Sequence, residues 1–256
     1  MEGLRKVISV IFSVYGFLIF LLLMIILFPA VIFASFFGRI KGGNMIYGIC
    51  RFWTDSAFLF WGICHINIYE APEKGDHPVV YVFNHVSYID IPMWLKATKG
   101  RHIRVLGKAE MAKIPIFGYI YKEAAILVDR RDANARARSL KELKYFLEKN
   151  ISVVIAPEGT FNMSDKPLAP FFDGAFRIAL ETGTPIRPVI FPDAKRRLSG
   201  HSIFTLSPGR GRAVFLEEIS VEDFSMSDIQ TLKQKTFNVM EDALIRYNAS
   251  WIKTRA

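Results

Sequence analysis

A run of residues without any charge, from Val7 to Phe37, is the feature that most limits how this chain can fold. The run exceeds the roughly 20 residues that a helix needs to cross a bilayer, so we expect a membrane-active helix here. A tilted span and a helix that enters the bilayer and bends near Pro29 both remain open. We do not expect a cleavable signal peptide, whose apolar part has only about 7–15 residues before a small-residue cleavage site.

Basic residues lie on both sides of this run, with Arg5 and Lys6 before it and Arg39 and Lys41 after it. Because the charge bias is the same at both ends, the positive-inside rule selects no orientation. The symmetry also suits a hairpin that inserts from one side of the membrane.

A second apolar segment, residues 44–64, contains Arg51 and Asp55, which are four positions apart and could pair on one helix face. Its aromatic residues are typical of a membrane interface, although an ordinary core helix is an open alternative. We expect residues 1–64 to form two helices that anchor the protein in or on one leaflet. Residues 65–256 then form the catalytic domain, on the cytoplasmic face.

Composition favours an anionic membrane surface as a partner. The chain of 256 residues is 51% hydrophobic and carries a formal net charge of +9. Such a charge also suits an acidic protein, but neither zinc-ligand spacing nor an RNA-binding aromatic motif supports a nucleic-acid partner. Cys50 and Cys64 both lie in the apolar N-terminal region and predict neither a disulfide framework nor a metal cluster.

After residue 64, apolar strands alternate with helical patterns. We expect strands at 65–69, 79–83, 101–106, 125–128, 151–156, 185–191, 202–206 and 212–217. We expect helices at 90–99, after a cap at Asp132 or Asn134, at 174–182, and from Ser227, where Gln230 completes a capping box, to about 247. This alternation predicts an α/β domain whose sheet is largely parallel and flanked by helices.

His85 follows the buried-strand pattern of residues 79–83 after one residue, Asn84, and Asp90 comes five positions later. Open α/β folds place their sites at the carboxyl ends of strands, so His85 is a candidate general base and Asp90 the group that orients it. A structural histidine with Asp90 as a helix cap is the alternative. Ser87 could be an acylated nucleophile, but we favour a capping role for it.

Two further strand ends carry polar clusters, Asp129-Arg130-Arg131 and Glu158-Gly159-Thr160. If these strands are parallel neighbours, all three clusters lie on one edge of the sheet. A neutral histidine with a carboxylate partner at that edge can accept a proton from an alcohol, which suggests acyl transfer to a hydroxyl.

Five motifs in order resemble those of the glycerolipid acyltransferase family, most closely its bacterial 1-acylglycerol-3-phosphate acyltransferases. The first is Asn84-His85, four residues and Asp90. The others are Lys108-Ala109-Glu110 with Pro115 and Gly118, then Val128-Asp129-Arg130, Pro157-Glu158-Gly159-Thr160, and Thr184-Pro185-Ile186-Arg187-Pro188-Val189.

The resemblance implies an O-acyltransferase in which His85 deprotonates the free hydroxyl of a lysolipid and Asp90 orients His85. The acyl donor is a thioester of acyl carrier protein or coenzyme A, no covalent acyl-enzyme forms, and no cofactor or metal is needed. Arg130 and Lys108 hold an anionic head group. Glu158, Gly159 and Thr160 shape the acceptor loop, and the product is phosphatidic acid for phospholipid biosynthesis.

This chain departs from the family pattern at Phe161, where the third motif usually continues with arginine, and near Phe172, where a basic residue is usual. Arginine recognises phosphate with two hydrogen bonds and phenylalanine cannot. A lysolipid without a phosphomonoester, such as a lyso-amino-acid lipid, is therefore an alternative acceptor. A catalytically silent membrane lipid-binding protein, or an acyl exchanger that uses no thioester, is a second alternative.

Overall fold

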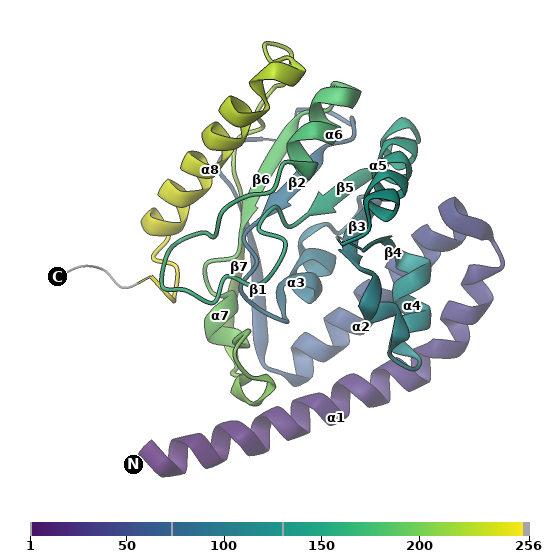
Figure 1. Ribbon diagram of the computed structural model, residues 1–256. Helices are drawn as coiled ribbons and strands as arrows, with labels where there is room; N and C mark the ends of the chain where they lie inside the picture. The colour runs from purple at the N-terminus through teal and green to yellow at the C-terminus, as the bar shows by residue number, and fades with distance from the viewer. Residues whose placement is uncertain (1, 73, 130, 253–256) are drawn as a thin grey trace.

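The computed structural model describes residues 2–72, 74–129 and 131–252 (Figure 1). Within them, seven strands form one sheet in the order β1-β7-β6-β2-β5-β3-β4. All neighbouring strands are parallel except β6 and β7. The expected α/β class with a largely parallel sheet is therefore confirmed. The strands are β1 Ile63–Tyr69, β2 Val80–Phe83, β3 Ile103–Lys108, β4 Ala125–Val128, β5 Ser152–Ile155, β6 Ile186–Ile190 and β7 Gly209–Phe215.

Helices cover both faces of this sheet (Figure 1). One face carries α5 Ala133–Glu148, α6 Gly174–Thr182 and α8 Ile229–Arg246, and the other carries α2 Gly43–Phe60 and α3 Asp90–Ala97. Short helices α4 Phe117–Ala124 and α7 Ala194–Arg197 lie at the strand ends. Since central strands are covered on both faces, all four residues of β2 are buried, which explains its unbroken apolar sequence.

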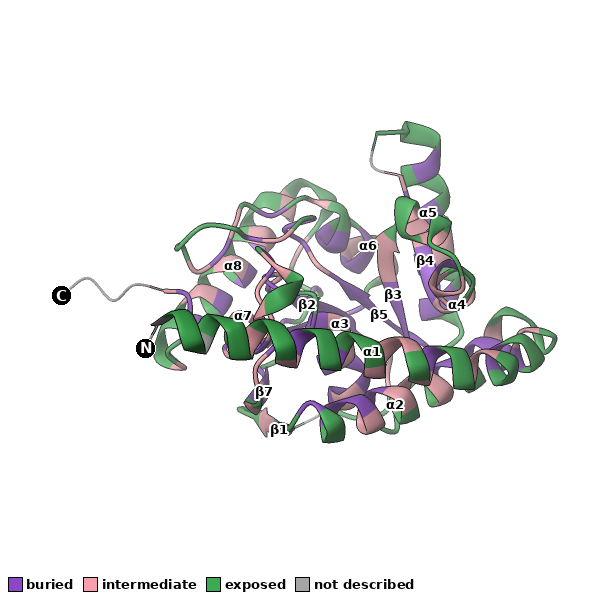
Figure 2. Cartoon of the chain, turned by 90° about the horizontal axis from the view of Figure 1, so that it is seen from below, coloured by how far each residue is buried: buried purple, intermediate pink, exposed green. Residues whose placement is uncertain are grey.

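The uncharged N-terminal run forms one helix, α1 Glu2–Ser35, which continues through Pro29. Figure 2, a view from below, shows α1 lying along the underside of the domain beside α2. A π-helical turn, Gly38–Gly42, joins the two helices. Within the described residues, one helix is long and apolar enough to cross a membrane, Lys6–Ser35 inside α1.

Helix α2 has apolar residues on both its buried and its exposed sides. Ile46 and Phe58 are buried, whereas Phe52 and Leu59 are exposed. Arg51 and Asp55, which the sequence places close enough to pair, have other partners: the Arg51 guanidinium donates to Arg101 O and Asp55 pairs with Lys96. Both side chains tie α2 to the domain instead of to each other.

Two local predictions were wrong, and two short helices were missed. Residues 202–206 are not a strand but contain a 3-10 turn, η3 Ile203–Thr205, because Ser and Thr side chains bond the local backbone: Phe204 N donates to Ser202 Oγ, and Thr205 Oγ1 donates to Ser202 O. The capping box before α8 is formed by Ser225 and Asp228 instead of Ser227 and Gln230. Helices α4 and α7 were not predicted.

Candidate active site

The turn after β2 places His85 against Asp90, with 2.8 Å between Nδ1 and Oδ2. The Asp90 side chain is fully buried, while that of His85 keeps 20% of its surface exposed, so a ligand can reach the imidazole but not the carboxylate. In a neutral imidazole that donates Nδ1–H to Asp90, the lone pair lies on Nε2. The geometry therefore suits a base with an orienting carboxylate.

Asp90 also fixes the backbone of this turn. Its Oδ2 accepts hydrogen bonds from Val86 N and Ser87 N, each 3.0 Å long. Burial raises the pKa of Asp90, against the lowering effect of the His85 hydrogen bond and charge. Ser87 holds the turn as well, since its Oγ donates to Leu198 O and accepts from Ile89 N.

Glu158, at the end of the neighbouring strand β5, supports His85 from the other side. Its Oε1 accepts from His85 N at 2.7 Å and its Oε2 accepts from Ala169 N at 2.7 Å. The residue is 2% exposed, and this burial raises its pKa to about 8. Its carboxyl group thus holds together the 158–169 loop and the turn of residues 84–90, which we call the catalytic turn because it carries the candidate base. Gly159 beside it adopts φ +73°, a left-handed conformation that favours glycine.

An aromatic cluster covers the imidazole. The centroid of the Phe161 ring lies 4.4 Å from that of the His85 ring and 4.9 Å from that of the Tyr88 ring, and both pairs meet edge to face. Thr160, just before Phe161, is exposed. The position where the family pattern has arginine is therefore occupied by an apolar wall against the candidate base.

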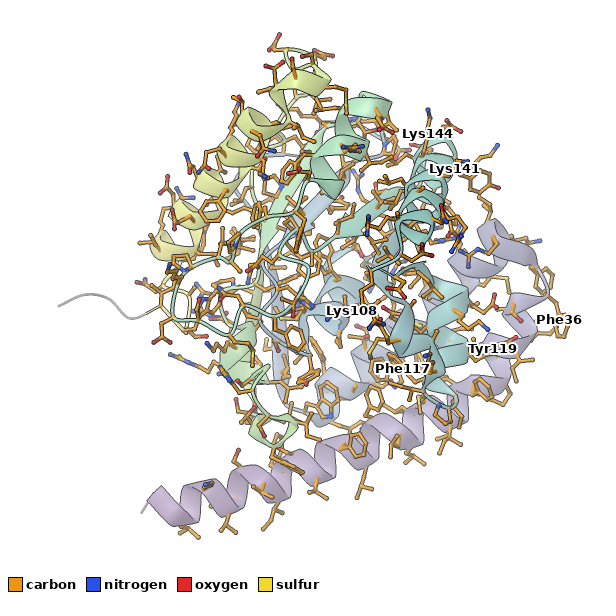
Figure 3. All side chains as sticks on the ribbon, viewed as in Figure 1. Phe36, Lys108, Phe117, Tyr119, Lys141 and Lys144 are labelled. Carbon is orange, nitrogen blue, oxygen red and sulfur yellow. The ribbon has the colours of Figure 1, made fainter. Side chains whose placement is uncertain are left out.

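The basic candidates are less tightly held. Lys108 ends β3 and is exposed (Figure 3). Strands β2, β5, β3 and β4 are parallel, so His85, Glu158 and Asp129 do lie beyond the same edge of the sheet. Among the described residues of the three polar clusters, His85 is bonded to both Asp90 and Glu158, while Arg131 lies near Asp129 and Glu110. Arg130 falls outside the described residues.

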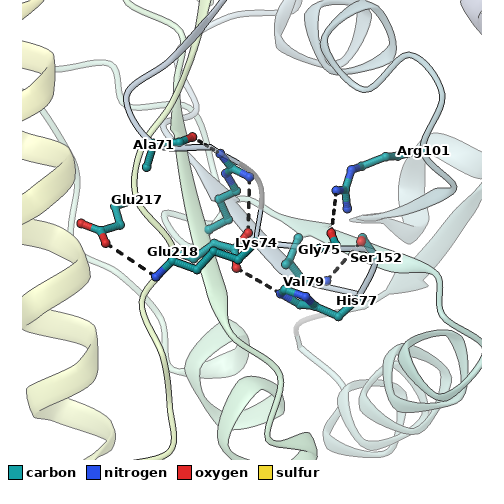
Figure 4. Close-up of polar contacts among 10 residues, drawn as sticks. Ala71, Lys74, Gly75, His77, Val79, Arg101, Ser152, Glu217 and Glu218 are labelled. Carbon is teal, nitrogen blue, oxygen red and sulfur yellow. Dashed lines mark hydrogen bonds and ion pairs between the residues drawn. The ribbon is translucent and has the colours of Figure 1, made fainter.

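A separate polar cluster lies at the opposite edge of the sheet (Figure 4). Buried Arg187 of β6 donates to Glu218 and to Ala71 O, and His77 Nε2 lies 3.1 Å from Glu218 Oε2. Arg187 belongs to the last of the five motifs, but its guanidinium binds these loops instead of reaching the His85 edge.

A family model described as Acyltransferase matches residues 64–192, half of the chain. The chain belongs to the acyltransferase family. The matched range contains every candidate site residue, so the strand-end clusters lie inside the part that defines the family.

Relatives within this family include a 1-acyl-sn-glycerol-3-phosphate acyltransferase from Cocos nucifera, 34% identical over 158 residues, which make up 60% of this chain and 48% of that protein. One of the same name from Haemophilus influenzae is 25% identical over 207 residues, covering 80% of this chain and 84% of the relative. The chain spans half or less of the length of the plant relatives it matches first.

The fold is similar to the crystal structure of the 1-acyl-sn-glycerophosphate (LPA) acyltransferase PlsC from Thermotoga maritima. The TM-score is 0.72 at 22% sequence identity, over 99% of this chain and 100% of that one. At this identity the match establishes the fold alone.

Two residues that support the site, Asn162 and Gly200, were not found from the sequence, and Asn84 was named in the first motif without a role. Asn84 Oδ1 accepts from Phe191 N at 2.8 Å, and Asn162 N donates to His85 O at 2.7 Å. Gly200 N donates to Val86 O. Their partners are far away along the chain, so no local pattern signals them; only the position of Asn84 beside His85 offered a clue.

Proposed function

We propose that this family member transfers a fatty acyl group from an acyl thioester to the free hydroxyl of 1-acylglycerol-3-phosphate, giving phosphatidic acid in phospholipid biosynthesis. The observation that carries the proposal is the 2.8 Å contact between His85 Nδ1 and buried Asp90. The names of the relatives from Cocos nucifera and Haemophilus influenzae support this acceptor.

In the proposed reaction His85 Nε2 takes the hydroxyl proton while the acceptor oxygen attacks the thioester carbonyl. Asp90 stabilises the imidazolium that forms. The tetrahedral intermediate collapses by breaking the C–S bond, and the imidazolium returns its proton to the leaving thiolate. The products are the diacyl lipid and a free thiol of acyl carrier protein or coenzyme A, with no covalent acyl-enzyme, metal or further cofactor.

The anionic head group would be bound by Lys108 and Arg130, with Gly159 and Thr160 in the acceptor loop. Glu158 would contribute indirectly, since its carboxyl group already accepts from two backbone N–H groups. The aromatic contact of Phe161 with His85 favours a second candidate acceptor, a lysolipid without a phosphomonoester. An apolar ring next to the base offers phosphate no hydrogen-bond donor.

We further propose that residues 1–64 anchor the catalytic part, residues 65–256, on one leaflet at its cytoplasmic face. Near its start α1 contacts the domain through Ser9, whose Oγ donates to Phe204 O. Near its end Ser35 Oγ lies 2.8 Å from Tyr119 OH, and the Phe28 ring contacts the Tyr119 ring edge to face. A helix held along the domain at both ends fits an in-plane position with its outer apolar face in lipid.

The deciding experiment compares the wild type with His85→Ala in vesicles that contain one acceptor and one labelled acyl thioester. We expect the substitution to abolish thioester consumption while the melting temperature is retained, because a partly exposed imidazole supports little of the core. Retained transfer would remove His85 from the mechanism.

A panel of acceptors separates the two candidates. Lysophosphatidic acid should be acylated faster than lysolipids that lack the phosphomonoester, and the reverse order would favour the second acceptor class. Absence of transfer to every acceptor would favour a silent lipid-binding protein, and turnover without a thioester would favour an acyl exchanger.

A further inference from the structure

The segment between α7 and β7, residues 198–206, connects the catalytic turn to the N-terminal helix; we call it the 198–206 loop. Figure 1 shows it descending from α7 to the first half of α1. Its upper end is bonded to the catalytic turn: Leu198 O accepts from Ser87 Oγ, and Gly200 N donates to Val86 O at 3.2 Å. Gly200 also packs against Phe161, since a Cβ added there would lie 3.0 Å from Phe161 Cδ2.

The lower end of the loop is bonded to α1. Phe204 O accepts from Ser9 Oγ at 3.3 Å, and Leu206 N donates to Ser13 Oγ at 3.0 Å. The Leu206 side chain fits against Gly16, where any Cβ would come within 2.2 Å of Leu206 Cδ2. Ser9, Ser13 and Gly16 share one face of the helix, and their small side chains permit this close approach.

Between these two ends the loop exposes an apolar tip. Ile203 and Phe204 keep 50% and 47% of their surfaces exposed, although both lie beside the most apolar helix of the chain. Two exposed arginines lie close by in sequence, Arg196 and Arg210. Apolar side chains flanked by cationic ones suit the headgroup region of an anionic phospholipid surface.

We propose that the 198–206 loop is a second lipid-contact element, in which Ile203 and Phe204 enter the same leaflet surface as α1. Its bonds to Val86 and Ser87 then hold the turn that carries His85 at a fixed position relative to that surface. This inference rests on the proposed leaflet anchoring by α1. The lipid surface is the occupant to which we commit, because the exposed apolar tip lies against α1, which itself exposes many large apolar side chains.

The test uses single labels of the environment-sensitive fluorophore nitrobenzoxadiazole in a Cys50→Ala, Cys64→Ser background. Phe204→Cys reports on the loop. Leu18→Cys reports on the anchor, because the native leucine of α1 is 59% exposed. Ile245→Cys is the matched control, because the native residue is 53% exposed on α8, away from α1 (Figure 1). The full-length protein is reconstituted into vesicles of phosphatidylethanolamine and phosphatidylglycerol that contain nitroxide-labelled lipid.

We expect the labels at positions 18 and 204 to be quenched by the nitroxide lipid and shielded from aqueous iodide, and the label at 245 to show the opposite. If position 18 is quenched while 204 behaves like 245, the loop proposal is overturned and the anchoring stands. If position 18 also remains accessible to iodide, the anchoring fails and the loop proposal fails with it.

A kinetic measurement distinguishes lipid contact from simple structural support. The double variant Ile203→Ser, Phe204→Ser should lower kcat/KM for a vesicle-embedded acceptor about tenfold, since two half-exposed apolar side chains leave the lipid contact. The activity with the embedded acceptor, divided by the activity with a water-soluble short-chain acceptor, should fall as well. Ile245→Ser should leave this ratio unchanged. Equal losses with both acceptors would show that the tip only supports the fold and would overturn the proposal.

Discussion

At the scale of single residues, the site depends on two carboxyl groups with different tasks. Asp90 Oδ2 accepts from the imidazole and from two backbone N–H groups, so it fixes the orientation of His85 and the shape of its turn together. Glu158 holds the backbone of His85 from the neighbouring strand. Both residues are buried, and a substitution at either one acts on the base without touching a ligand.

Replacing Asp90 with asparagine tests the first task. An amide presents one acceptor oxygen and one donor nitrogen, so it cannot both receive Nδ1–H and stabilise an imidazolium. We expect Asp90→Asn to lower kcat by roughly 10³-fold or more, by analogy with triads whose carboxylate is replaced. Steady-state kinetics with a melting curve measure this, and a kcat within threefold of the wild type would contradict the orienting role.

The raised pKa of Glu158 predicts how stability depends on pH. Burial raises this pKa from 4.5 to about 8, so the folded protein binds the proton more tightly than the unfolded chain does. The stabilisation from Glu158 is complete below pH 4.5 and is lost as the pH rises towards 8. The raised pKa of Asp90 acts with the same sign.

We therefore expect the melting temperature of the wild type to decrease as the pH is raised from about 5 to about 8. The decrease per pH unit should be smaller in Glu158→Gln, because its amide does not titrate. Thermal unfolding across that range measures both slopes. A slope unchanged by the substitution would show that other groups dominate.

At the scale of elements, the attachment of the helix pair to the sheet depends on one buried side chain. Arg104 of β3, 1% exposed, donates to Arg39 O, Ile40 O and Asn44 Oδ1 around the turn between α1 and α2. Its guanidinium also lies 4.9 Å from the centre of the Phe146 ring of α5. This residue therefore joins the N-terminal helices, the sheet and a covering helix.

Arg104→Met should lower the free energy of unfolding by about 3 kcal/mol, because several hydrogen bonds from a charged donor are lost. Faster tryptic cleavage at Arg39 and Lys41 should accompany the loss. Arg138→Met is a suitable control, since its side chain is 72% exposed on α5 and surface changes usually stay within about 0.5 kcal/mol. Equal cleavage rates in the two variants would contradict the attachment role.

The elements that could be predicted were those whose sequence pattern lies within one continuous stretch of the chain. The strand before His85, the five-residue spacing to Asp90 and the run 174–182 with Gly183 after it lie in single stretches of sequence, and the structure has all three. The 198–206 loop failed as a strand because hydroxyl groups of its Ser and Thr side chains bond the backbone. The bond from His85 N to Glu158 crosses 73 residues, which no local pattern can signal.

At the scale of the whole molecule, a net charge of +9 acts on any charged partner at a distance. An acidic acyl carrier protein would be steered towards this surface, whereas an uncharged thioester would not. Salt screens such steering, since the Debye length falls from about 10 Å at 0.1 M to about 3 Å at 1 M ionic strength.

We expect kcat/KM with acyl carrier protein as donor to fall about tenfold between 0.05 and 0.5 M sodium chloride, with kcat nearly constant. Acyl-pantetheine, an uncharged donor with the same reacting group, should change much less. Initial rates at several donor concentrations give both constants, and equal salt dependence for the two donors would argue against long-range steering.

The position of α1 along the domain, and not across it, has a consequence for the kinetics of an enzyme anchored as proposed. Acceptor and product would enter and leave through the same monolayer, so the search for substrate would be two-dimensional. The rate would follow the mole fraction of acceptor in that monolayer, not its molarity in water, and diluting the acceptor with inert lipid would slow turnover at constant bulk concentration. Each completed cycle would also enlarge one monolayer by one acyl chain, leaving the opposite monolayer to be supplied by lipid transfer.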